Sequence, residues 1–256
     1  MRPHDFAEEP GRQVRARMMA LFTEAVVPRT DALPGDGEQG EARFLRMCRA
    51  LVQVTEAQGG ALTLAPGELH RVTLCATDDT ASRLENLQEV IGQGPVLDAA
   101  SSGRVITAEL GGQPGTGPWP VLASTMAEEL GALVVQALPM RVGSETLGVA
   151  SVYRRAATGR WSPPTHEASV LAGMIGAAIV SSGLDGEAGL SWDVRDRISQ
   201  ATGMVIAQLG ISAVDAAALI RTAAFSAGMD MAEIATEILE YRRDFSTDQD
   251  GGGDHR

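Results

Sequence analysis

The sequence contains no lysine, and all 21 of its basic residues are arginine. This absence excludes mechanisms that need an ε-amino group, among them P-loop phosphate binding, pyridoxal Schiff bases and protein kinase catalysis. Acidic residues outnumber basic ones by 33 to 21, and the net charge of −12 opposes a broad attraction to phosphate backbones or anionic lipid. Any binding to nucleic acid must therefore depend on a local site.

Cysteine is scarce, and long apolar runs are missing from the sequence. Cys48 and Cys75 lie in apolar surroundings at a spacing that matches no zinc or redox motif, so we expect buried structural thiols in a reducing compartment. The N-terminal residues lack the apolar core of a signal peptide, and no stretch approaches the roughly 18 apolar residues of a membrane span. We therefore expect a soluble, cytoplasmic protein that does not bind membranes.

The residue types that usually perform catalysis form no recognisable constellation. The histidines are scattered along the chain without metal-ligand spacing, at His4, His70, His166 and His255. No HExxH or GxSxG motif occurs, and the glycine-rich loop at 111–117 lacks the residues of a P-loop. The sequence therefore predicts no catalytic residues, no metal site and no enzymatic activity.

What the sequence does contain is an ordered series of helix and strand signals, in a chain of 256 residues of which 44% are apolar. Such a chain can form a sizeable core and one large or two small domains. The signals indicate an α+β fold with an antiparallel sheet, in which Pro66-Gly67 joins the first two strands as a hairpin. The predicted elements are helices at 12–26 and from 41 to 58, strands at 60–65 and 69–77, a helix at 80–90, a turn at 92–95, a strand at 104–110, a loop at 111–120, a helix at 121–131, strands at 132–140 and 146–154, and a helix that is capped at Ser162-Pro163 and ends near Ser182.

The last part of the chain has the pattern of three helices. Periodic apolar residues predict them at 192–209, 213–226 and 231–243, after a segment near 183–190 that has little pattern and marks a domain boundary. The signals for their ends are the caps Ser191, Ser212 with Asp215, and Asp230 with Glu233, and the left-handed stops Gly210 and Gly228.

Specific motif positions occur in this helical part at defined spacing: Gln200-Ala201, Gly203-Met204, Ala207, Ala216, Arg221 and Ala235. By these positions residues 188–248 resemble the ANTAR domain, a three-helix RNA-binding module of bacterial antiterminators. Many ANTAR domains have lysine where this chain has Thr202. The resemblance predicts a C-terminal all-α RNA-binding domain, followed by a disordered tail at 249–256.

Upstream, a second set of short motifs follows in a familiar order: Leu84 to Gln88, Gly92 to Pro95, Leu97 to Ala99, Trp119-Pro120, Ala137 to Gly143 and Leu147 to Val149. By this series residues 41–182 resemble the GAF sensor domain that precedes ANTAR in many actinobacterial regulators. Residues 1–40 form an N-terminal helix and linker outside both resemblances.

The GAF resemblance implies a pocket between the sheet and the loops that cover it. Cyclic nucleotides, haem, bilins or no ligand at all are compatible with the family, so the cofactor and the ligand-binding residues are unknown. A bilin needs a cysteine and haem an axial ligand, but we interpret Cys75 and His70 as ordinary strand residues. Val96 stands where many such domains have cysteine, which argues against thiol-based sensing there.

By the ANTAR resemblance, the expected RNA-binding residues are Arg197, Gln200, Thr202 and Arg221. Arg197 and Gln200 are three residues apart and share one face of a helix. The alternative is that the arginines pair with neighbouring acids, as Arg195 could with Asp193 or Asp196. We interpret the small residues Ala201, Gly203 and Ala207 as sites of close helix packing, and the aromatic residues Trp192, Phe225 and Tyr241 as core or interface residues.

The resulting hypothesis is a signal-responsive regulator that binds hairpin loops in nascent messenger RNA and so prevents a terminator stem from forming. Coupling is expected to run through the helix at 163–182 into the first C-terminal helix, whose apolar stripe could also pair two chains as a homodimer. The alternatives are a ligand-sensing or protein-interaction module whose C-terminal helices only dimerise or dock on a partner, and, ranked last, a DNA-binding helix-turn-helix. The sequence identifies neither the ligand, nor the target transcripts, nor the direction of the response.

Overall fold

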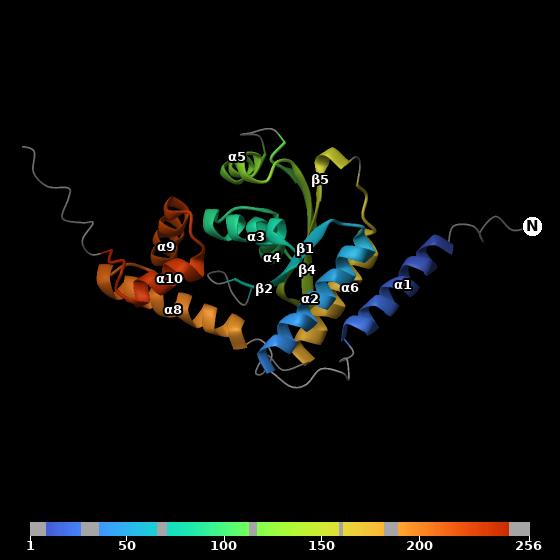
Figure 1. The fold of residues 1–256 in the computed structure, drawn as a ribbon, viewed down its shortest axis with the longest axis horizontal. Coiled ribbons are helices and arrows are strands. Elements are labelled where there is room, and N and C mark those ends of the chain that lie inside the picture. Colours follow the sequence, from blue (N-terminus) through green and yellow to red (C-terminus); the bar gives the residue numbers. More distant parts are fainter. Residues whose placement is uncertain are drawn as a thin grey trace, which may run out of the picture.

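The structure is a computed structural model that describes residues 9–26, 36–65, 71–112, 117–158, 161–181 and 189–245, without the side chains of 9–14, 36–42 and 189–195. A sheet domain and a C-terminal helical module follow one another along the chain (Figure 1). The elements of the sheet domain are α1 (Glu9–Val26), α2 (Asp36–Thr55), β1 (Gly59–Leu64), β2 (Val72–Ala76), α3 (Asp79–Ile91), α4 (Pro95–Ser102), β3 (Ile106–Leu110), α5 (Pro120–Glu129), β4 (Leu133–Val142), β5 (Glu145–Arg155), a single 3₁₀ turn (Ala156–Thr158) and α6 (Thr165–Ser181). The module consists of α8 (Gly189–Leu209), α9 (Ala213–Ala227) and α10 (Met231–Leu239).

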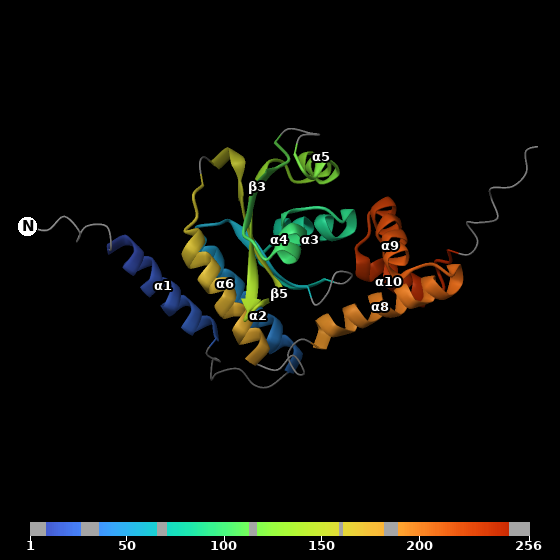
Figure 2. The same ribbon diagram turned by 180° about the vertical axis from the view of Figure 1, so that it is seen from behind.

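Five antiparallel strands form the sheet in the order β2-β1-β5-β4-β3, as expected for the α+β fold. The central strands β4 and β5 bury side chains on both faces, because alternate residues point to opposite sides. Leu138 and Val152 pack in the cluster that contains α1, α2 and α6. Val135 and Tyr153 pack in the cluster formed by α3 and α5 on the other face. The sheet is thus enclosed between two layers of helices (Figures 1 and 2).

Two features of the sheet domain differ from the sequence prediction. The helix α4 follows the segment predicted as a turn, because Gly94 adopts a φ of 141° and Pro95 then serves as the first helical residue. The helix α6 begins at Thr165, and not at Ser162-Pro163, because the carbonyl of Pro164 accepts the first helical hydrogen bond from the amide of Ala168. The predicted cap was therefore placed two residues too early.

The cysteines are buried, as predicted. Cys48 on α2 and Cys75 on β2 are free thiols within the core on the α1, α2 and α6 side of the sheet. Contact with Cys75, together with burial, raises the pKa of the Cys48 thiol well above its ordinary value. The thiol therefore stays protonated and behaves as an apolar side chain.

The capping signals of the helical module act largely as predicted. The Ser212 hydroxyl accepts a hydrogen bond from the amide of Asp215, and Asp230 and Glu233 form a reciprocal capping box. Gly210 and Gly228 have φ values of 65° and 67°, which end α8 and α9 in the left-handed conformation. The outer ends are less regular: α8 begins at Gly189, before Ser191, and α10 ends at Leu239, four residues earlier than predicted.

A helix that crosses a bilayer needs about 18 or more predominantly apolar residues. None of the described helices is long and apolar enough on its own; Asp196–Leu209 and Ala213–Ala227 reach the required length and composition only as a pair, and that pair is bent by 108°.

Candidate functional site

The exposed face of α8 carries two of the four predicted RNA-binding residues. Arg197 and Gln200 are both exposed, and within the described part of the chain Arg197 has no ion pair. Gly203 and Ala207 are also exposed and continue the same face, one and two turns after Gln200. This face of α8, defined by Arg197, Gln200, Gly203 and Ala207, therefore combines a cation and an amide with two small residues. The exposed carboxylate of Asp196 lies one turn before Gln200 on the same side of the helix.

Gly203 and Ala207 were interpreted as sites of close helix packing, and for both that interpretation is wrong. A Cβ atom added at Gly203 would meet nothing within 4 Å. Only Ala201, which is fully buried between helices, is small because of packing. An exposed glycine inside a helix costs about 1 kcal/mol relative to alanine, so packing does not explain its presence.

Thr202 cannot take part in this face. Its side chain is only 5% exposed, and its hydroxyl donates a 2.7 Å hydrogen bond to the carbonyl of Ile198, one turn earlier on α8. The hydroxyl is thus already used inside the module. The prediction that Thr202 contacts RNA is therefore corrected: the position lies on the buried side of α8.

Arg221 lies on α9, apart from the α8 face and against the sheet domain. Its Nε lies 3.7 Å from the position that a Cβ of Gly92 would occupy, so the side chain crosses the C-terminal end of α3. Helix C-termini expose carbonyl groups and partial negative charge, which attract a guanidinium group. Burial nevertheless lowers the pKa of Arg221, because this environment removes part of its hydration.

The contact between the two domains involves more than this arginine. Figures 1 and 2 show α9 beside the end of α3, and α8 runs past β2. Val90, the penultimate residue of α3, is 6% exposed and belongs to the hydrophobic cluster of the module, together with residues such as Ile220 and Ile234. We call this contact the junction; its residues are Arg71, Glu89, Val90, Gly92, Arg221 and Asp230.

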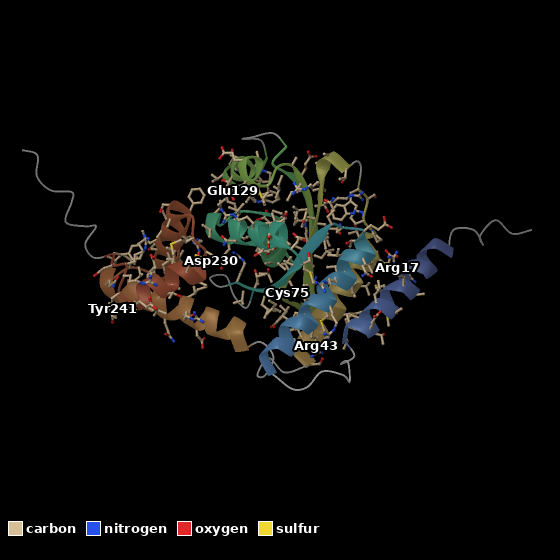
Figure 3. All side chains as sticks on the ribbon, in the orientation of Figure 1. Arg17, Arg43, Cys75, Glu129, Asp230 and Tyr241 are labelled. Carbon is tan, nitrogen blue, oxygen red and sulfur yellow. The ribbon has the colours of Figure 1, made fainter. Side chains whose placement is uncertain are left out.

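The charges at the junction are poorly compensated. Burial raises the pKa of Glu89 to about 7, with contributions from Asp230 and Glu85, although Arg71 and Arg221 oppose the increase. The Nε of Arg71 is buried without a hydrogen-bond partner, and burial lowers the pKa of this arginine. No ion pair joins Glu89 to either arginine in the described ranges. Figure 3 labels Asp230 where the module meets α3.

Two of the three aromatic residues that were expected in the core or at an interface lie on the surface of the module. Phe225 is 48% exposed and Tyr241 is 80% exposed, so neither is a core residue. Tyr241 follows the end of α10 with a φ of 55°, and Figure 3 shows it at the outer edge of the module. Trp192, like Asp193 and Arg195, lies outside the described side chains.

The alternative in which arginines pair with acids holds at the C-terminal end of the module. Arg243 pairs with Glu237 at 3.0 Å, and Arg242 pairs with Glu240 at 2.6 Å. Both arginines therefore have part of their charge compensated by a neighbouring carboxylate.

The interior of the sheet domain contains a buried carboxylate in the middle of α3. Glu85 accepts hydrogen bonds from the Thr63 hydroxyl on β1, at 2.8 Å, and from the Ser151 hydroxyl on β5, at 2.5 Å. Burial raises the pKa of Glu85, and these hydrogen bonds partly counteract the increase. Next to it, Leu84 fills the space between helix and sheet. Glu85 therefore ties α3 to two strands.

Neither the metal site nor the ligand site acquires a candidate from the structure. No group of three or more metal-ligating side chains comes together within the part of the chain that the structure describes. Cys75 is a buried strand residue, Val96 is a buried residue in the first turn of α4, and His70 lies outside the described residues. The residues that would hold a sensory ligand thus remain unassigned.

Comparison with known proteins identifies the class of the helical module. Residues 192–239 match the ANTAR domain, which covers all three of its helices. No curated protein matches the chain.

Several solved GAF domains resemble the sheet domain. The nlh2 GAF domain of A. Aeolicus in an inactive state has a TM-score of 0.45 at 10% identity, covering 66% of this chain and 99% of that one. The GAF domain of a sensor histidine kinase from Pseudomonas syringae pv. tomato has a TM-score of 0.40 at 14% identity, covering 70% and 94%. The GAF domain of a phosphoenolpyruvate-protein phosphotransferase from Coxiella burnetii has a TM-score of 0.43 at 14% identity, covering 66% and 95%.

The chain thus combines an α+β sheet domain, with the architecture expected from the GAF resemblance, and a C-terminal ANTAR domain.

Proposed function

We propose that this protein is an RNA-binding regulator, in which the sheet domain at 41–182 receives a signal and the ANTAR domain at 188–248 binds hairpin loops in nascent messenger RNA. Binding would hold the transcript in a form that excludes the terminator stem, so transcription continues. The protein performs no covalent chemistry in this proposal. The signal is a small molecule or a protein partner of the sheet domain.

The observation that carries the proposal is the α8 face of an ANTAR domain, with Arg197 and Gln200 exposed beside Gly203 and Ala207. Loop bases that are splayed from a hairpin are recognised by arginine stacking, side-chain hydrogen bonds and a few phosphate contacts. An arginine and an amide one turn apart supply such groups. The glycine and the alanine leave room for a sugar or base to approach the helix backbone.

Two copies of the chain would bind two adjacent loops, because linking two weak sites raises affinity through effective concentration. The apolar stripe of α8, which was expected to pair two chains, is occupied within the module, where Ile198, Ala201 and Val205 are buried. A homodimer would therefore need another surface.

Full-length protein and a fluorescent RNA with two six-nucleotide hairpin loops test the proposal by polarisation at low salt. Arg197→Ala is expected to weaken binding roughly tenfold, because one arginine contact to a base or phosphate contributes about 1 to 3 kcal/mol. Arg104→Ala removes an exposed arginine of the sheet domain, far along the sequence from the module, and serves as the matched control. The same stems without loops serve as control RNA. Equal affinity for both RNAs, or equal effects of both variants, would contradict the proposal.

A docking function is the second candidate, and one observation favours it. The helix α9 exposes apolar side chains at Val214, Leu219 and Phe225, with exposed fractions of 60%, 37% and 48%. Apolar surface of this kind suits a protein partner. A folded protein that fails to bind the two-loop RNA even at low salt would favour docking over RNA binding.

A further inference from the structure

We infer that RNA and the sheet domain compete for the same side of the ANTAR domain, the side of α9 that carries Arg221, so that the arrangement seen here withholds this arginine from RNA. The inference rests on the proposed function and concerns the regulation of that site. The arrangement with α9 against α3 is called the closed arrangement below.

The position of Arg221 makes the two uses exclusive. Its side chain lies across the end of α3, in van der Waals range of the Gly92 position, and it is half-buried there. A phosphate or a base needs to face the guanidinium group directly, within about 3 Å of its nitrogen atoms. The helices α3 and α9 are in contact, and both ribbon views show α9 beside the end of α3 (Figures 1 and 2). The side of the guanidinium group that lies against α3 therefore becomes available to RNA only after α9 leaves α3.

Among the described residues, Val90 is the buried apolar side chain that the sheet domain contributes to the hydrophobic cluster of the module. Val90 is the member of α3 that packs in the hydrophobic cluster of the module, whereas Leu84 and Leu87 of the same helix pack inside the sheet domain. A substitution at Val90 therefore weakens the junction while the sheet domain's own core stays complete. Val90 offers a specific perturbation that leaves the ANTAR residues untouched.

The polar groups of the junction hold it weakly. Glu89 faces Arg71 from the start of β2, Arg221 from α9, Asp230 from the cap of α10 and Glu85 from its own helix. None of these groups forms an ion pair with Glu89 within the described ranges, and the Nε of Arg71 has no partner. Buried polar groups without partners lower the stability of a contact. An RNA ligand that interacts more favourably with Arg221 can therefore separate the junction.

The test is a double-mutant cycle on RNA affinity with the full chain. Val90→Asp places a charge in the junction and is expected to tighten RNA binding about tenfold, because apparent affinity scales with the open fraction. Arg221→Ala is expected to change affinity less than about twofold in the wild-type background, and about tenfold beside Val90→Asp, since only the open form uses this arginine. Arg197→Ala should weaken binding by the same factor in both backgrounds.

A second measurement avoids reliance on a variant that could misfold. In the unmodified protein, saturating two-loop RNA should increase hydrogen exchange of the α3 amides near Val90, because RNA binding uncovers the end of that helix. Val90→Ala is a milder substitution than Val90→Asp and is expected to change RNA affinity in the same direction.

The outcomes separate the two proposals. Absence of RNA binding in every variant would overturn the proposed function itself. Loop-specific binding that Arg197→Ala weakens would leave the function in place. The competition would be overturned if, at the same time, Val90→Asp bound RNA with wild-type affinity, the effects of Arg221→Ala and Val90→Asp were additive, and exchange in α3 were unchanged.

Discussion

Replacing Glu89 by glutamine distinguishes two opposite roles for this carboxylate at the junction. The position alone, between Arg71 and Arg221, suggests a clamp that attracts both arginines. The raised pKa indicates the reverse, because a carboxylate whose ion pairs dominate has a lowered pKa. Glu89→Gln keeps the size of the side chain and removes the charge. We expect the variant to stabilise the closed arrangement and to bind RNA more weakly than wild type at neutral pH.

The magnitude follows from the pKa. Its rise from an ordinary value of 4.5 to about 7 corresponds to at most about 3 kcal/mol, since one pKa unit is worth about 1.4 kcal/mol. A raised pKa means that protonation favours the folded, closed state. That contribution is complete below pH 4.5 and is lost as the pH rises through about 7. The closed arrangement should therefore weaken between these values, and RNA affinity should rise with it.

Polarisation with the two-loop RNA at pH 6 and pH 8 measures both effects. Wild type is expected to bind several-fold more tightly at pH 8 than at pH 6, whereas Glu89→Gln should bind with the same, weaker affinity at both. Urea unfolding of the same proteins reports how much of the effect belongs to the sheet domain's own stability. Glu145→Gln, which neutralises an exposed acid at the start of β5 in the sheet domain, provides a matched charge control.

The reasoning would be refuted if Glu89→Gln bound RNA more tightly than wild type at pH 8. In that case the carboxylate would act as the clamp, and its ion pairs would outweigh its burial.

Two further predictions concern α8 and the interior of the sheet domain. Gly203→Ala should raise the free energy of unfolding by about 0.5 to 1 kcal/mol, because alanine favours a helix and the added methyl group meets open space, yet it should weaken RNA binding; unchanged affinity would argue against a close approach of RNA at this position. Ser151→Ala removes a hydrogen-bond donor from the buried Glu85 carboxylate and should cost about 1 to 3 kcal/mol in urea unfolding at pH 8. The raised pKa of Glu85 means that this cost should decrease as the pH falls, and a loss that is independent of pH would contradict this account.

Local signals in the sequence predicted most of the fold. The hairpin of β1 and β2, the helix α3 and the capping box at Asp230 all depend on residues close to one another in the chain. The helix α4 was missed because glycine followed by proline suits both a turn and a helix start, and only the surrounding structure distinguishes them.

The candidate site was less predictable, because it depends on which helix faces are covered. Periodicity correctly placed Arg197 and Gln200 on one face of a helix. It could not show that Thr202 points inward, because Thr202 follows the buried Ala201 at the edge between the buried and exposed sides of α8. Nor could it show that α3 covers Arg221, because that contact joins residues more than a hundred positions apart. One signal for this site was available in the sequence. Gly203 is a helix-destabilising residue inside a strong helix pattern.

The hydrogen bonds of Glu85 fix the same helix, α3, that also carries the junction residues Glu89 and Val90. The Glu85 side chain is fixed to β1 and β5, and Glu89 and Val90 follow about one turn later on the same helix. The interior of the sheet domain and the surface that contacts the helical module are therefore separated by only about 6 Å along one helix. A signal that loosens those two hydroxyl contacts needs no relay of intermediate side chains, because shifting or tilting one short helix delivers it.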